Sequence, residues 1–171
     1  MDGRRALDDL FSAAYEELRR LASTVKRGDG AITLSPTALV NEAWVKLAKS
    51  PGFAATSPLH FKRIAARAMR QVLIEAARRR RADKRSSGAF TITFDEMSNF
   101  PAQSEHDLLA LDVALQDLAR IQPRQAMMVE SRFFGGLDTG ELATLLDVSE
   151  ATVLRDWRAA RAWLAQELRR R

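Results

Sequence analysis

Apolar residues recur every three or four positions along most of this chain. This spacing is typical of amphipathic helices, because 3.6 residues per turn bring such positions onto one face. In the first segment, which ends near Gly28 and Gly30, the apolar positions are Leu7, Leu10, Phe11, Ala14, Leu18, Leu21 and Val25. Further helices are expected from Pro36, from Pro58 to the run Arg78–Arg81, at Glu105–Arg120, Pro123–Phe134 and Thr139–Leu146, and after Ser149. The sequence therefore predicts an all-α fold.

Two stretches without this periodicity divide the chain. Proline, glycine and small polar residues at 50–57 indicate a loop, and a similar composition at 83–104 indicates a linker. The alternating residues Phe90–Phe94 resemble a short strand, but no partner strand is predicted, so we expect an extended segment on another protein. The predicted organisation is a three-helix domain at 1–82, a flexible linker at 83–104 and a second helical domain at 105–171.

Residues Gly136 to Leu164 have the pattern of a helix-turn-helix. Asp147 tolerates the left-handed backbone that such a turn requires, and Ser149 is a good N-cap for the second helix. Val153, Trp157, Ala160 and Leu164 form the apolar stripe of that helix, so we expect Ala151, Arg155, Arg158 and Ala162 on its solvent face. An ordinary two-helix corner of a bundle is the alternative interpretation of this stretch.

The positive charge of the chain is concentrated in one segment. Of the formal net charge of +5, residues 60–85 alone carry ten basic and two acidic side chains, a net of +8. A basic helix face of this kind is typical of phosphate contact, although a solvated charge run is the alternative.

Several classes of protein are not supported by the composition. There is no cysteine, and His60 and His106 lie far apart, so we expect no metal, no cofactor and no enzyme activity. No apolar run approaches the roughly 20 residues of a membrane span, and the segment MDGRRALDDL is too polar for a secretory signal. We therefore expect a cytoplasmic protein without a membrane partner.

Taken together, the runs LVNEAWVKL, FKRIAARAMRQVLIEAARRRRADKR and RDWRAARAWL resemble those of bacterial extracytoplasmic-function (ECF) sigma factors. The resemblance covers nearly the whole chain. It implies that residues 1–82 form sigma region 2 and residues 105–171 form region 4, and that the protein binds core RNA polymerase through the clamp helices and flap of its large subunits. It also implies promoter DNA as a partner, with region 2 melting and reading the minus-10 element and region 4 reading the minus-35 element.

The resemblance assigns candidate DNA contacts to both regions. Melted bases need aromatic and polar surfaces, and the strand backbone needs cations. One of the candidates below, Phe53, could equally serve only to anchor its own loop. For the minus-10 element the candidates are Phe53, His60, Arg63, Arg67, Arg70, Gln71 and Arg78. For the minus-35 element they are Ser149, Glu150, Ala151, Thr152, Arg155, Arg158 and Arg161. Leu154 and Asp156 depart from the commonest family pattern, and we expect Asp156 to pair with a neighbouring arginine.

The start of the second predicted helix departs from the family in charge. Many ECF sigma factors carry acidic residues there that dock on the polymerase clamp, whereas this chain has Ser35-Pro36-Thr37-Ala38, followed by Leu39-Val40-Asn41-Glu42. The resemblance places the polymerase contact at Thr37, Ala38, Asn41 and Glu42. A phosphate on Thr37, or on Ser35, would restore negative charge at a helix N-terminus, so a Ser/Thr protein kinase is a further candidate partner. The alternative is that Ser35-Pro36-Thr37 simply starts a helix efficiently.

A second function class fits the same helix-turn-helix. A stand-alone dimeric regulator would bind duplex DNA without polymerase, and it would recognise a symmetric operator. The basic helix at 58–81 favours the sigma factor, because a dimeric repressor does not need a second DNA-reading surface.

Overall fold

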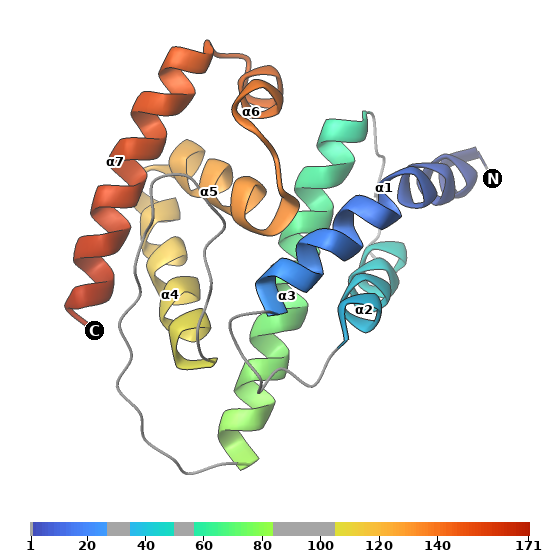
Figure 1. The fold of residues 1–171 in the computed structure, drawn as a ribbon, viewed down its shortest axis with the longest axis horizontal. Coiled ribbons are helices and arrows are strands. Elements are labelled where there is room, and N and C mark those ends of the chain that lie inside the picture. Colours follow the sequence, from blue (N-terminus) through green and yellow to red (C-terminus); the bar gives the residue numbers. More distant parts are fainter. Residues whose placement is uncertain (1, 27–34, 50–56, 84–104) are drawn as a thin grey trace.

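The computed structural model describes residues 2–26, 35–49, 57–83 and 105–171, and these form seven α-helices and no strand. They are α1 (Asp2–Lys26), α2 (Pro36–Ala48), α3 (Pro58–Asp83), α4 (Glu105–Ile121), α5 (Pro123–Gly135), α6 (Thr139–Leu146) and α7 (Glu150–Arg169). The predicted all-α fold is confirmed. Helix α3 runs through the middle of the molecule, between α1 and α2 on one side and α4 and α5 on the other (Figure 1).

The helix ends follow local chemistry. The Ser35 hydroxyl accepts a hydrogen bond of 3.1 Å from the Ala38 amide, which caps α2 ahead of Pro36. Gly136 ends α5 in the left-handed conformation, with φ of 67°. Asp138 and Glu141 form a capping box at the start of α6, in which each carboxylate accepts from the other residue's amide.

The amino-terminal half, which we define as α1–α3, buries one face of each helix. Leu18 from α1, Val40 from α2 and Phe61 from α3 are all nearly inaccessible to solvent. Phe11 of α1 stacks on Trp44 of α2, with ring centroids 4.4 Å apart. The apolar stripes predicted from spacing therefore form the contacts among these three helices.

The carboxy-terminal half, α4–α7, packs α4 and α5 against α7, while the short α6 lies on α7 and α5. Leu115, Phe134 and Leu142 are fully buried in it. Val153, Ala160 and Leu164 face inward from α7, as their spacing predicts, and Trp157 is partly buried beside them.

The two halves meet along α3, and their buried residues form one continuous hydrophobic cluster. Gly135 of α5 allows this close approach: a Cβ atom placed on it would lie 2.9 Å from the Ala66 Cβ and 3.2 Å from the Lys62 carbonyl oxygen of α3. The division into domains at 1–82 and 105–171 remains a prediction.

Some sequence predictions fall outside the described residues, namely those for Phe53, for the loop at 50–56, for Phe90–Phe94 and for most of the linker. Within the described part of the chain, no helix is long and apolar enough to span a membrane.

Candidate nucleic-acid interface

Helices α6 and α7 are joined by the tight turn that the sequence predicts. Asp147 has φ of 53°, in the left-handed region, and the Val148 amide donates back to the Ala143 carbonyl oxygen at 3.1 Å. The Ser149 hydroxyl accepts from the Thr152 amide at 3.2 Å and caps α7. Both local predictions, for Asp147 and for Ser149, are confirmed. The result is a helix-turn-helix in which the start of the second helix, residues 149–151, is exposed to solvent.

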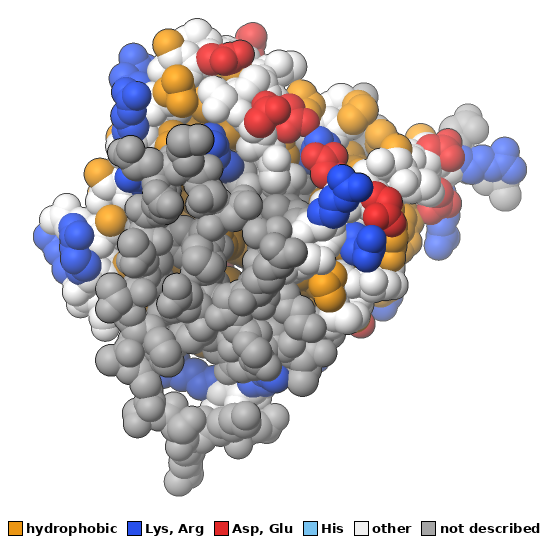
Figure 2. All heavy atoms as spheres, in the orientation of Figure 1, with side chains coloured by type: hydrophobic (Ala, Val, Ile, Leu, Met, Phe, Trp, Pro, Cys, Tyr) orange, Lys and Arg blue, Asp and Glu red, His pale blue; other side chains and the backbone are white. Residues whose placement is uncertain are grey.

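The exposed face of α7 carries most of the predicted minus-35 residues. Ser149, Glu150, Ala151, Arg155 and Arg158 are exposed, whereas Thr152 and Arg161 are half-buried. Figure 2 shows basic side chains along the edge of the molecule where α7 lies. This face offers arginines and an acid to base edges in a groove that admits one helix.

Asp156 lies on the opposite side of α7, where it is 8% exposed. Its carboxylate pairs with Arg124 of α5 at 2.5 Å and, more distantly, with Arg155 at 3.9 Å. The expected pairing with a neighbouring arginine is thus only the longer contact, to Arg155, and the main partner lies in another helix. Asp156 thus fixes the orientation of α7 on α5 and does not lie on the exposed face.

Arg132 of α5 contacts α7 through Trp157. Its guanidinium carbon lies 4.7 Å from the centre of the Trp157 ring, a cation–π contact. Burial lowers the pKa of Arg132 from its ordinary value, against the opposing effect of Asp138. Since an arginine remains charged at neutral pH, it holds Trp157 in place without a proton change.

Helix α3 presents the predicted minus-10 residues in two different environments. Arg67, Gln71 and Arg78 are exposed, and His60 and Arg63 are half-buried. Arg63 contacts the carboxy-terminal half, where its Nη1 lies 3.6 Å from the Met127 sulfur. The basic face is therefore only partly open to solvent.

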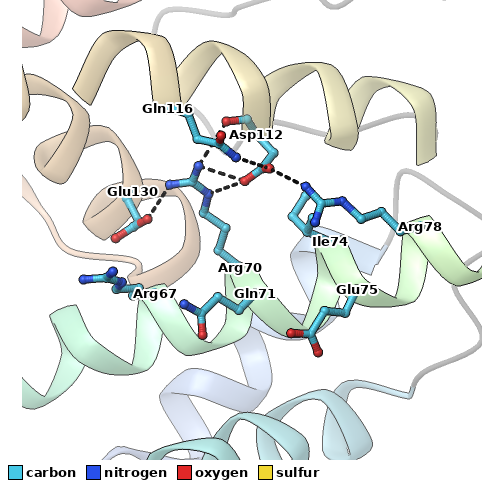
Figure 3. A pocket seen from close by; sticks show the side chains of 9 residues that line it. All are labelled: Arg67, Arg70, Gln71, Ile74, Glu75, Arg78, Asp112, Gln116 and Glu130. Carbon is cyan, nitrogen blue, oxygen red and sulfur yellow. Dashed lines mark hydrogen bonds and ion pairs between the residues drawn. The ribbon is translucent and has the colours of Figure 1, made fainter. Parts of the chain in front are cut away.

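Arg70 is enclosed by acids from the carboxy-terminal half (Figure 3). Its Nε donates to the Asp112 carboxylate at 2.9 Å, its Nη1 to the Glu130 carboxylate at 2.5 Å, and its Nη2 to the Asp112 carbonyl oxygen at 3.1 Å. Gln116 holds Asp112 from the other side at 2.8 Å. These groups line a pocket of about 300 Å³ between α3, α4 and α5. Arg70, a predicted minus-10 contact, is thus largely enclosed in this structure, with its side chain 14% exposed.

A second ion cluster lies two turns earlier on α3. The Lys62 ammonium contacts Glu17 of α1 at 2.8 Å and Glu141 of α6 at 2.7 Å. Burial alone would lower the pKa of Lys62, but the hydrogen bonds to Glu141 and Glu17 outweigh it and raise the pKa above its ordinary value. Lys62 therefore stays charged and links both halves.

Sequence reasoning missed Asp112, Glu130 and the two partners of Lys62. One signal was available for Asp112, because it stands four residues after Leu108 and next to Leu111 on the apolar side of its helix. An acid on such a face needs a buried partner. Nothing in the spacing indicates that Arg70 is that partner.

The predicted polymerase-binding residues lie on α2. Thr37, Asn41 and Glu42 are exposed, Ala38 is half-buried, and the first turn of α2 contains no acidic residue. Among the side chains that the structure describes, no group of three or more potential metal ligands comes together.

A helix-turn-helix together with a helix rich in arginine is a combination typical of DNA-binding transcription proteins. The family model described as ECF sigma factor matches residues 2–170. The chain therefore belongs to the ECF sigma factor family, whose members are transcription initiation factors that act with RNA polymerase on promoter DNA. Neither the curated proteins nor the solved structures contain a significant match to it.

Proposed function

We propose that this sigma factor docks on core RNA polymerase through α2, reads the minus-10 element with α3 and reads the minus-35 element with α7. The observation that carries the proposal is the capped, exposed start of α7 in a helix-turn-helix. Arg155 and Arg158 project from its open face, where they can reach guanine edges in a major groove. The opposite side of α7 is buried against α4, α5 and α6, so it cannot contact a groove.

The exposed part of α3 supports the minus-10 assignment. Arg67 and Arg78 can hold the strand backbone, while the Gln71 amide offers both a donor and an acceptor to an unpaired base. Arginines at 79 and 81 extend the exposed cationic surface toward the end of the helix. Backbone contacts of this kind set affinity, and Gln71 supplies sequence choice.

Transcription in vitro tests this function. Purified core polymerase and the chain are incubated with genomic DNA fragments, and start sites are mapped. Initiation at an asymmetric two-block promoter, absent with either component alone, is expected. Binding to a symmetric operator by the chain alone, with no polymerase-dependent start site, would instead identify a dimeric regulator.

We further propose that phosphorylation of Thr37 strengthens the contact between α2 and polymerase. Thr37 is exposed in the first turn of α2, whereas the Ser35 hydroxyl is engaged in capping the helix. A phosphate on Thr37 would add about −1.5 to −2 charges at the positive end of the helix dipole. It would supply the negative charge that this first turn lacks.

Substitutions at Thr37 would distinguish the effect of negative charge from the effect of side-chain size. Thr37→Glu is expected to raise promoter-specific transcription above that of the unmodified chain, while the isosteric neutral variant Thr37→Gln should not. Phosphorylated wild type should exceed both. If the unmodified chain already initiates fully and Thr37→Ala behaves like wild type, phosphorylation at this position has no role.

A further inference from the structure

Leu154 of α7 is a large apolar side chain that the fold leaves open to solvent. It is 42% exposed, whereas Trp157 of the same helix is partly buried against the hydrophobic core. A single exposed leucine is common on a protein surface, so its place on α7 decides what it can do. Among the described residues, the other exposed large apolar side chains all lie outside the helix-turn-helix: Val45, Val113 and Ile121.

Leu154 lies on the face of α7 to which the proposed function assigns the minus-35 element, and the inference below rests on that function. It follows Ala151 by three residues and precedes Arg158 by four, and both of these residues are exposed. Such spacings place side chains on one helix face. Leu154 is only about 6 Å along the helix axis from Glu150, at the end of α7 that lies beside α6 (Figure 1). It therefore belongs to the amino-terminal part of the helix, which contacts base edges in a helix-turn-helix.

A leucine on this face can recognise one chemical group of duplex DNA. Its side chain has no donor and no acceptor, so it cannot bind a phosphate oxygen or the polar edge of a base. The four standard bases present a single apolar group in the major groove, which is the C5 methyl group of thymine. Burying this methyl group against an apolar side chain is favourable because both surfaces leave water. Leucine at this position thus favours thymine by a group that uracil lacks.

We propose that Leu154 is a specificity-determining residue that contacts the C5 methyl group of one thymine in the minus-35 element. Ala151, one turn earlier on the same face, extends the apolar surface with its own methyl group. Arg155 and Arg158 are exposed beside Leu154 and offer hydrogen bonds to guanine. Reading by α7 then combines polar contacts with one apolar contact, and the preference for thymine does not depend on charge.

Replacement of thymine by deoxyuridine tests the contact directly. This exchange removes the methyl group and keeps every hydrogen-bonding group of the base. The probe is a promoter duplex that the wild type selects together with core polymerase. Each thymine of its minus-35 element, on either strand, is replaced in turn. The affinity of the complex of sigma factor and polymerase for each duplex is measured by competition with the unmodified promoter.

One replacement is expected to weaken binding by the wild type about fourfold, the effect of one buried methyl group. Leu154→Ala and Leu154→Gln should not distinguish thymine from deoxyuridine at that position. Leu154→Met keeps an apolar side chain of similar volume and should keep the preference. The matched control Ile121→Ala removes a 57% exposed apolar side chain from the end of α4 and should behave as the wild type.

Three results would overturn the proposal. The first is a preference for thymine that persists in Leu154→Ala, even if this variant binds all the duplexes more weakly, because Leu154 would then contact polymerase instead of the base. The second is a wild type that binds every deoxyuridine duplex as tightly as the unmodified promoter. The third is a selected minus-35 element that contains no thymine. Circular dichroism checks that the variants of this exposed residue keep the helix content of the wild type.

Failure of the inference can be distinguished from failure of the proposed function. If the wild type initiates at a two-block promoter but binds thymine and deoxyuridine duplexes equally, the sigma factor function stands and the methyl contact is excluded. If the wild type does not initiate with polymerase at all, the proposed function is contradicted and the inference with it.

Discussion

Asp156 has a structural role within α7, the helix to which the proposed function assigns reading of the minus-35 element. It stands on the side of α7 turned toward α5, and its carboxylate binds Arg124 while almost wholly buried. At a position where the family pattern often has a basic residue, this chain has an acid that orients the reading helix. Its loss should therefore change stability more than it changes DNA sequence preference.

Replacing Asp156 with Asn tests this role. The variant should lower the free energy of unfolding by about 1.5 kcal/mol, a usual value for a hydrogen bond to a charged group. Urea denaturation of Asp156→Asn, Arg124→Gln and the double variant would measure the coupling between the two side chains. Additive effects of the two substitutions would mean that the pair contributes nothing.

At the scale of single helices, two substitutions on α7 would distinguish base-specific contacts from a general effect of positive charge. Arg155→Ala should reduce transcription from the wild-type promoter about tenfold, because one paired contact to guanine contributes about 1–3 kcal/mol. Arg169→Ala removes the same charge from the exposed last turn of the same helix and should have little effect. Measured side by side, equal losses from both variants would show that α7 contributes charge alone.

The helices were predicted closely because their start and end signals are local. The predicted segment Thr139–Leu146 coincides with α6, and the start of α2 at Pro36 follows from the Ser35 cap. The first helix begins at Asp2, five residues before the first apolar position, Leu7. Periodicity did not indicate this turn because residues 3–6 are exposed. Local signals of this kind need only neighbouring residues.

The environment of Arg70 was not predictable in the same way. Its partners Asp112 and Glu130 lie 42 and 60 residues further along the chain, in two different helices. Periodicity identifies which face of each helix is apolar, but it does not indicate which acid meets which base across helices. The exposed residues of the candidate sites were therefore predictable, and the occlusion of Arg70 was not.

At the scale of the whole molecule, Lys62 joins α1, α3 and α6 through two carboxylates. Lys62→Met keeps the aliphatic stem and removes these bonds, so it should lower the free energy of unfolding by about 2 kcal/mol. Chemical denaturation at several pH values would measure the difference in the free energy of unfolding between this variant and the wild type, which we call the gap.

The pH dependence of that gap follows from the raised pKa of Lys62. A raised pKa in the folded state means that the stabilisation is fully present below the ordinary value of 10.5 and is lost as pH rises through the higher folded value. The gap should therefore be constant from about pH 7 to pH 9. A gap that shrinks within this range would show that another titrating group supplies the stabilisation.

Glu141 holds two partners with two different oxygens: Oε2 accepts from the Asp138 amide within α6, and Oε1 accepts from Lys62 of α3. The first of these bonds lies within the α6 segment and does not depend on the contact with α3. The start of each helix of the helix-turn-helix is therefore held by hydrogen bonds within its own segment. Binding to duplex DNA accordingly has little ordering entropy to offset at this element.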